Sequence, residues 1–155
     1  MGLIQSLIIC VGDLLLLGVQ CKSPAAFIFA GLFTSFVYVN IIYALSITFK
    51  HIGKAVSVIL VIIQIPGSAG TYPIEMTPAF FQKLHPLLPF TYGINAMREA
   101  VAGIYGFHYA ENLLCLAVYV PIALLIGVVV RPWLLNLNHM FDQKLGETEL
   151  MICEE

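Results

Sequence analysis

Charged residues are scarce in this sequence: they make up 10% of its 155 residues, against about 25% in soluble domains. The few lysines and arginines form no basic block, so we expect no nucleic-acid partner. No GxxxxGK[ST] loop, HExxH pair or nucleophile elbow is present, so the motifs that bind ATP phosphates, hold zinc or present a catalytic serine are missing. The four cysteines show no CxxC spacing and the four histidines are scattered. We therefore expect no enzyme, cofactor or metal site.

Hydrophobic residues are abundant instead, at 60% of the chain with a mean hydropathy of +0.94. Charge-free runs extend over 25–48, 55–74 and 112–130, and the run 1–21 is interrupted only by Asp13. Each run meets the ~20 residues that a helix needs to cross a hydrocarbon core of ~30 Å. The predicted fold class is therefore all-α, a polytopic transmembrane helix bundle.

Four spans are predicted, at about 2–20, 25–49, 53–65 and 112–130. Pro24 suits the first turn of the second span, and Pro121 is expected to kink the fourth span. Together with the segment between the last two spans they form one predicted membrane domain, 1–132. Residues 133–155 are predicted to be a cytoplasmic amphipathic segment with an acidic tail; a plain stop-transfer flank is the alternative.

The basic residues set the predicted orientation. Lys50, His51 and Lys54 lie between two spans, and Arg131 follows the last one. By the positive-inside rule both places are cytoplasmic, which puts 66–111 on the outer side and the C-terminus inside. No basic region precedes the first apolar run, so it does not resemble a signal peptide. We expect the chain to be the membrane-embedded end of a longer protein, or a truncated relative.

The segment 66–106 is too apolar for a solvated loop and too rich in proline and glycine for one spanning helix. Thr77-Pro78 predicts the start of a short helix, and Thr91 predicts the cap of a second one. Both are too short to span the membrane, so the segment is predicted to be a re-entrant outer hairpin. Irregular backbone survives at membrane depth only where protein or a wet cavity satisfies its polar groups, which makes this hairpin the best candidate for a functional gate.

Two sets of candidate residues follow from this reading. The outer gate set contains Pro66, Gly67, Gly70, Tyr72, Pro73, Pro86, Pro89, Tyr92, Asn95, Arg98 and Glu99. The intramembrane polar and hinge set contains Asp13, Gln64 and Pro121. Arg98 and Glu99 either meet headgroups and water, line an outer vestibule, or lock this helix to the top of a span. Asp13 is either a functional interior carboxylate or lies nearer an interface. Gln64 could hydrogen-bond between helices, and a packing role is expected for it.

One string of motifs carries a family resemblance. It consists of Gly70-Thr71-Tyr72-Pro73-Ile74-Glu75, Thr77-Pro78-Ala79-Phe80-Phe81, His85-Pro86-Leu87-Leu88-Pro89-Phe90-Thr91-Tyr92 and Asn95-Ala96-Met97-Arg98-Glu99. In this string the sequence resembles the membrane domain of ABC type-2 transporter permeases, and is most similar to the C-terminal region of the YhgE/Pip family, the bacterial phage infection proteins. The close match covers about the middle third of the chain.

The resemblance implies a dimeric permease bundle that exports a substrate across the bacterial plasma membrane, with a separate ATPase subunit or a longer membrane partner. Substrate passage would use the Gly-rich break and Pro121 as hinges. The alternative is a scaffold or receptor subunit through which nothing crosses, such as a phage receptor or a component similar to type VII secretion. The family's large extracellular region has no counterpart in this sequence.

Overall fold

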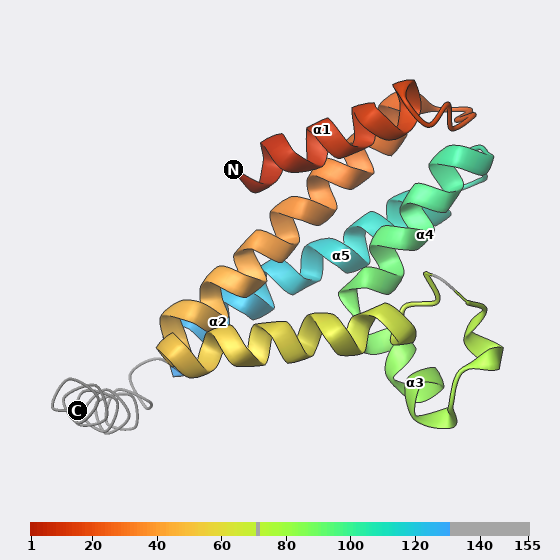
Figure 1. The fold of residues 1–155 in the computed structure, drawn as a ribbon. Helices are drawn as coiled ribbons and strands as arrows, with labels where there is room; N and C mark the ends of the chain where they lie inside the picture. Colours follow the sequence, from red (N-terminus) through yellow and green to blue (C-terminus); the bar gives the residue numbers. More distant parts are fainter. Residues whose placement is uncertain (71, 131–155) are drawn as a thin grey trace, which may run out of the picture.

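The computed structural model describes residues 1–70 and 72–130, without the side chains of 50–52 and 130. This part of the chain is all-helical, as predicted, and contains no strand (Figure 1). Its elements are α1 (Gly2–Leu15), α2 (Pro24–Gly67), η1 (Ile74–Met76), α3 (Ala79–Leu84), η2 (His85–Leu87), α4 (Pro89–Ala102), α5 (His108–Leu125) and η3, a π-helix (Ile126–Val130). The predicted amphipathic segment and acidic tail, 133–155, lie outside the described residues.

Helix α2 is 44 residues long and folds back on itself (Figure 1). Its first arm is Pro24–Phe49 and its second arm is Gly53–Gly67. A Cβ atom at Gly53 would collide with the backbone carbonyl of Leu45, on the other arm. A residue without a side chain therefore allows the two arms to meet this closely. The arms occupy about the same residues as the predicted spans 25–49 and 53–65, and the backbone stays helical between them. By length and composition only the first arm is long and apolar enough to cross a membrane.

Helix α1 runs antiparallel to the first arm of α2. The Ser35 hydroxyl donates a hydrogen bond to the Gly2 carbonyl, 3.0 Å away, while Cys10 packs in one core cluster with Phe27. The helix ends at Leu15, so the predicted span 2–20 is wrong at its C-terminal end. The chain turns there because Gly18 adopts a φ of +64°, in the left-handed region that glycine tolerates.

Helices α4 and α5 form a second antiparallel pair, joined by residues 103–107. The side chains of Ala96 and Ala100 are fully buried, and a Cβ atom at Gly93 would lie 2.9 Å from the Thr34 side chain. Small residues thus bring α4 close to the first arm of α2. The start of α2 lies beside the end of α4, since the Ser23 amide donates to the Ala100 carbonyl over 3.2 Å.

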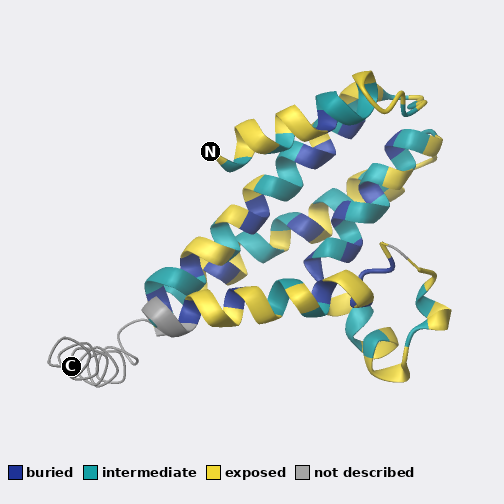
Figure 2. Cartoon of the chain, viewed as in Figure 1, coloured by how far each residue is buried: buried dark blue, intermediate teal, exposed yellow. Residues whose placement is uncertain are grey.

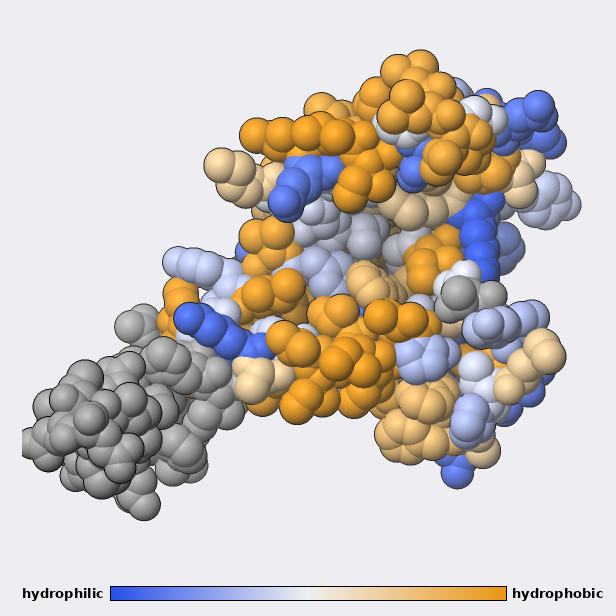
Figure 3. Space-filling view, in the orientation of Figure 1, coloured by the Kyte–Doolittle hydropathy of each residue, from blue (hydrophilic) through white to orange (hydrophobic). Residues whose placement is uncertain are grey.

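The surface is strongly apolar. Pro24–Phe49 and His108–Val129 are long and apolar enough to cross a membrane, by length and composition, and only 28% and 11% of their apolar windows are buried. A core helix of a soluble protein would be mostly covered. Exposed residues cover the outer sides of α1 and of the second arm of α2 (Figure 2), and two hydrophobic bodies flank a hollow, less hydrophobic band (Figure 3). An apolar surface of this extent indicates lipid or protein cover.

Candidate functional site

The second arm of α2 ends where the sequence predicted a break. Pro66 lies in its last turn, and Gly67 is the last helical residue. A Cβ atom at Gly67 would collide with the Leu88 side chain, so the end of α2 packs directly on the turn that precedes α4. Ala69 then adopts a φ of +56°, in the left-handed region that L-residues rarely occupy. The chain leaves the bundle here for the excursion that contains η1 and α3 (Figure 1).

The chain returns through a turn at 85–89 that side chains hold together. The His85 Nδ1 atom lies 2.7 Å from the Gly67 carbonyl oxygen. The Thr91 hydroxyl donates to the His85 carbonyl over 2.8 Å, and the Tyr92 hydroxyl donates to the Pro86 carbonyl over 2.7 Å. The prediction that Thr91 caps the second helix is wrong: α4 begins at Pro89. The fixed φ of proline suits the first helical position, and Thr91 stabilises the turn from inside the helix.

This turn lies beside the middle of the first arm of α2 and the middle of α5, and not beyond the ends of these two segments. The Tyr119 hydroxyl, near the middle of His108–Val129, donates to the Leu87 carbonyl over 3.0 Å. The ring of Tyr38, near the middle of the first arm of α2, lies 4.5 Å from the ring of Phe90, measured between centroids. The proline-rich turn therefore packs between the central parts of both helices.

A buried polar pair, Tyr38 and Gln64, joins the two arms of α2 next to this turn. The Tyr38 hydroxyl donates to Oε1 of Gln64, whose side chain is fully buried. The Gln64 Nε2 atom has no hydrogen-bond partner among the described residues. Gln64 also lines a mainly apolar cavity of about 190 Å³ that reaches Tyr119 and Ile122 of α5. The hydrogen bond of Gln64 thus joins the two arms of one helix.

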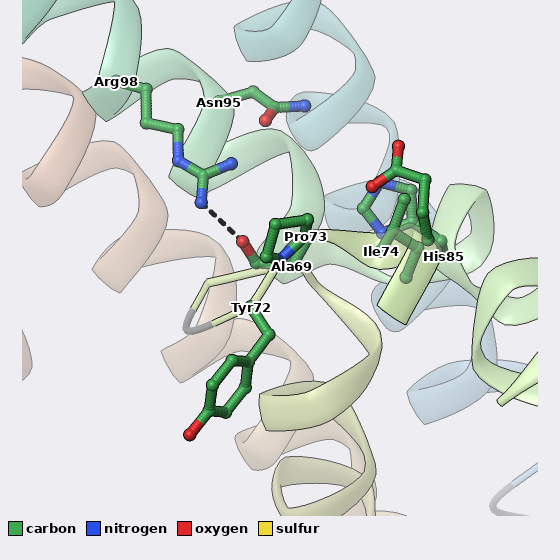
Figure 4. A pocket seen from close by; sticks show the side chains of 8 residues that line it. Ala69, Tyr72, Pro73, Ile74, His85, Asn95 and Arg98 are labelled. Atoms are coloured by element: carbon green, nitrogen blue, oxygen red, sulfur yellow. Dashed lines mark hydrogen bonds between the residues drawn. The ribbon is translucent and has the colours of Figure 1, made fainter. Parts of the chain in front are cut away.

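A polar pocket of about 380 Å³ opens beside the Gly-rich break. Its lining residues are Ala69, Tyr72, Pro73, Ile74, Glu75, His85, Asn95 and Arg98. Arg98 and Asn95 project from α4, and an Nη2 hydrogen of Arg98 is donated to the Ala69 carbonyl (Figure 4). The ring of Tyr72 points away from them (Figure 4). The pocket therefore combines a cation, a carboxylate, an imidazole and an amide.

Four of these lining residues, Tyr72, Pro73, Asn95 and Arg98, belong to the predicted outer gate set, and Glu75 and His85 do not. Both missed residues stand in the motif string that carries the family resemblance. Their positions in that string were the one sequence feature that could have marked Glu75 and His85 as site residues. Neither residue belongs to a periodic pattern or has an evident partner in the sequence.

Other predicted site residues lie elsewhere. Glu99 accepts a hydrogen bond from Asn112 of α5 over 3.3 Å, and its second carboxylate oxygen is buried without a partner in the described chain. Asp13 lies in the last turns of α1 and is partly exposed. Pro121 is an exposed residue inside α5, before the π-helix that begins at Ile126. None of these three lines the polar pocket.

The comparison with known proteins agrees with the motif string. Residues 1–129 match the family described as ABC-2 family transporter protein. The chain belongs to this family. It is also similar to the uncharacterized protein YhgE of Bacillus subtilis (strain 168), with 36% identity over 107 residues, which is 68% of this chain. The chain spans only 14% of the length of that curated relative. No solved structure matches it.

Membership of this family confirms the predicted resemblance to ABC type-2 permeases. The 36% identity with YhgE confirms the narrower resemblance to the YhgE/Pip family. A permease-like membrane component is the role that this family supports. The two apolar helices described above agree with a place in the membrane.

Proposed function

We propose that this chain is the membrane-spanning part of an ABC-2-type exporter of the bacterial plasma membrane, with 66–106 as a re-entrant gate on the outer side. One observation carries the proposal: the turn at 85–89 is bonded to the middle of α5 and packs on the middle of the first arm of α2. If these two helices cross the bilayer, the turn lies near the midplane.

The bonding within this segment suits such a depth. No water satisfies backbone polar groups in the hydrocarbon core, so irregular backbone there needs partners from the protein. The carbonyls of Gly67, His85 and Leu87 each accept a hydrogen bond from, or lie within hydrogen-bond distance of, a side chain. This supports a re-entrant segment over a water-soluble connector.

In the proposed arrangement of four crossings, two elements together make the third crossing. The second arm of α2, at 15 residues, reaches only about 22 Å at 1.5 Å per residue, less than the ~30 Å of the core. In the proposed arrangement the second arm extends from the inner surface to the turn at 85–89, and α4 extends from this turn to the outer surface. Lys54 then lies inside with the C-terminus, and 16–23 and 103–107 lie outside.

The energy source and the partners form part of the same proposal. The sequence has no P-loop, so ATP hydrolysis would come from a separate ATPase subunit. The exposed apolar sides of α1 and of the second arm need cover, such as Ile8 at 66% and Ile59 at 56% exposure. Lipid and a second copy of the chain in a homodimer would together provide it.

Single-cysteine labelling tests this proposal. In a background without Cys10, Cys21, Cys115 and Cys153, cysteines are introduced at Gly106, Lys54 and Leu87 and probed on intact cells with a membrane-impermeant maleimide. We expect labelling at Gly106 and none at Lys54. At Leu87 we expect labelling that differs between energised and ATP-depleted cells.

The opposite results separate the competing interpretations. Labelling of Lys54 from outside would reverse the proposed orientation. Labelling at Leu87 that is equal in energised and ATP-depleted cells would favour a static scaffold or receptor subunit over an exporter.

A further inference from the structure

We propose that the polar pocket beside the Gly-rich break binds a zwitterion that carries a phosphate and a primary ammonium, with the phosphate at Arg98 and the ammonium at Glu75. The source that the structure favours is the headgroup of phosphatidylethanolamine. This inference rests on the proposed function only in that it needs the re-entrant segment to face the membrane. Arg98 lies one turn before the end of α4 at Ala102, so in the proposed arrangement the phosphate is nearer the outer surface than the turn at 85–89 is.

The first argument is an unpaired set of charges. Arg98 and Glu75 line the same pocket, yet no ion pair joins them within the described part of the chain. The guanidinium is fixed at one end by its hydrogen bond to the Ala69 carbonyl, which leaves its other N–H groups available. The Glu75 carboxylate has no hydrogen-bond partner among the described residues. Two opposite charges separated by open space suit a ligand that carries both.

The second argument is the chemistry between these charges. The Asn95 amide lines the pocket and makes no hydrogen bond to the rest of the described chain. The ring of His85 is engaged through Nδ1, so its Nε2 atom remains for a ligand. Guanidinium groups bind phosphate through two parallel N–H···O bonds. The volume of about 380 Å³ falls at the small end of ligand sites, which measure roughly 300–1,000 Å³.

The third argument favours a lipid over a soluble zwitterion. Tyr72, which lines the pocket, is 68% exposed, and Met76 and Phe80 further along the same excursion are 77% and 64% exposed. These side chains offer an apolar surface to acyl chains, which a soluble phosphoethanolamine does not have. Phosphatidylglycerol satisfies Arg98 but places no cation at Glu75, so a headgroup with an ammonium fits better.

The test measures the shift in the melting temperature of the purified full chain in detergent, with four probes. These are dioctanoyl phosphatidylethanolamine, phosphatidylcholine and phosphatidylglycerol, and free phosphoethanolamine. We expect the ethanolamine lipid to give the largest shift. Phosphatidylcholine should bind more weakly, because its quaternary ammonium donates no hydrogen bond to Glu75.

Four variants assign the effect to the pocket. Arg98→Gln should weaken the binding of both the ethanolamine and the glycerol lipid by about tenfold or more, the size of a lost charge-assisted hydrogen bond. Glu75→Gln should remove only the preference for the ethanolamine lipid. Lys83→Gln, on α3 and outside the pocket lining, should leave all shifts unchanged. Arg98→Lys, which keeps the charge, should retain part of the binding and so separates lost binding from lost folding.

The outcomes decide the proposal. Equal shifts with all three lipids, or a Lys83→Gln variant that behaves like Arg98→Gln, would overturn it. An equal shift with free phosphoethanolamine would keep the zwitterion site but overturn the lipid source. Because binding is measured in detergent, a failure here leaves the cysteine-labelling result untouched, and a failure of the labelling test leaves this measurement interpretable.

Discussion

The hydroxyl group of Tyr119 donates a hydrogen bond to the backbone carbonyl of Leu87 across 3.0 Å and attaches the proline-rich turn to the middle of α5. The two residues are 32 positions apart in the sequence. The bond bears directly on the proposed gate because any opening at this turn has to break it or carry α5 along.

Tyr119→Phe should therefore loosen the turn. We expect the free energy of unfolding to fall by about 0.5–1.5 kcal/mol, the net value of one hydrogen bond, and the labelling of a cysteine at Leu87 to become faster. Thermal unfolding in detergent and maleimide kinetics measure the two effects. Tyr43→Phe is the matched control, because Tyr43 is 64% exposed and its hydroxyl makes no hydrogen bond within the described residues. Equal effects of both substitutions would refute the specific role of Tyr119.

The buried pair of Tyr38 and Gln64 allows a double-mutant cycle. Tyr38→Phe leaves both polar atoms of the buried Gln64 amide without a partner, which costs about 1–3 kcal/mol. Gln64→Leu strands only the Tyr38 hydroxyl and should cost less. The double variant should be more stable than the sum of the two single losses predicts, since replacing both partners by apolar groups can be nearly neutral. Strictly additive losses would show that the two side chains do not interact.

The bend of α2 depends on Gly53. Gly53→Ala brings a methyl group against the Leu45 backbone carbonyl, and we expect a loss of about 1–3 kcal/mol, typical of overpacking. Gly12→Ala is the control on another helix, where a Cβ atom meets only the Leu16 side chain at 3.9 Å. That substitution should stabilise the chain by about 0.5–1 kcal/mol, because glycine inside a helix carries an entropic penalty. Thermal unfolding of both variants checks the pair of predictions.

The contact between Gly93 of α4 and Thr34 of α2 predicts that one substitution restores the stability that the other removes. A Cβ atom at Gly93 would lie 2.9 Å from both Cγ2 and Oγ1 of Thr34, so Gly93→Ala should destabilise the chain by about 1–3 kcal/mol. Thr34→Ala removes both of these atoms and leaves the Thr34 Cβ at an ordinary 3.5 Å. It also removes a buried hydroxyl that has no partner in the described chain. The double variant should regain most of the lost stability; a double variant as unstable as Gly93→Ala would contradict this packing.

Much of the local structure could be predicted from the sequence because proline and glycine act on their own neighbourhood. The first residue of α2 is Pro24, its last is Gly67, and α3 follows Pro78, all close to the predicted positions. The C-terminal end of α1 was harder to predict because Leu16, Leu17 and Val19 keep the sequence apolar on both sides of Gly18. There the backbone conformation decides the helix end, and hydropathy does not.

The arrangement of the candidate site depends on long-range contacts that local patterns do not contain. Glu75 joins Arg98 in one pocket only because the chain between them leaves the bundle and returns at His85. The depth of the turn likewise follows from Tyr38 and Tyr119, two tyrosines with no distinguishing context in their apolar runs. Sequence patterns indicated which segment matters, and packing decides which of its residues meet.

Because no loop separates the two arms of α2, the second arm can rotate about Gly53 as one rigid helix. From Gly53 to Gly67 it is a continuous helix of about 22 Å, and its far end is in contact with Leu88 through Gly67. A rotation of about 5° at Gly53 would displace Gly67 by roughly 2 Å, given that length. A movement imposed near Lys54 would thus displace the turn at 85–89 by a distance comparable to a hydrogen-bond length. The helix between Lys54 and the turn would keep its secondary structure.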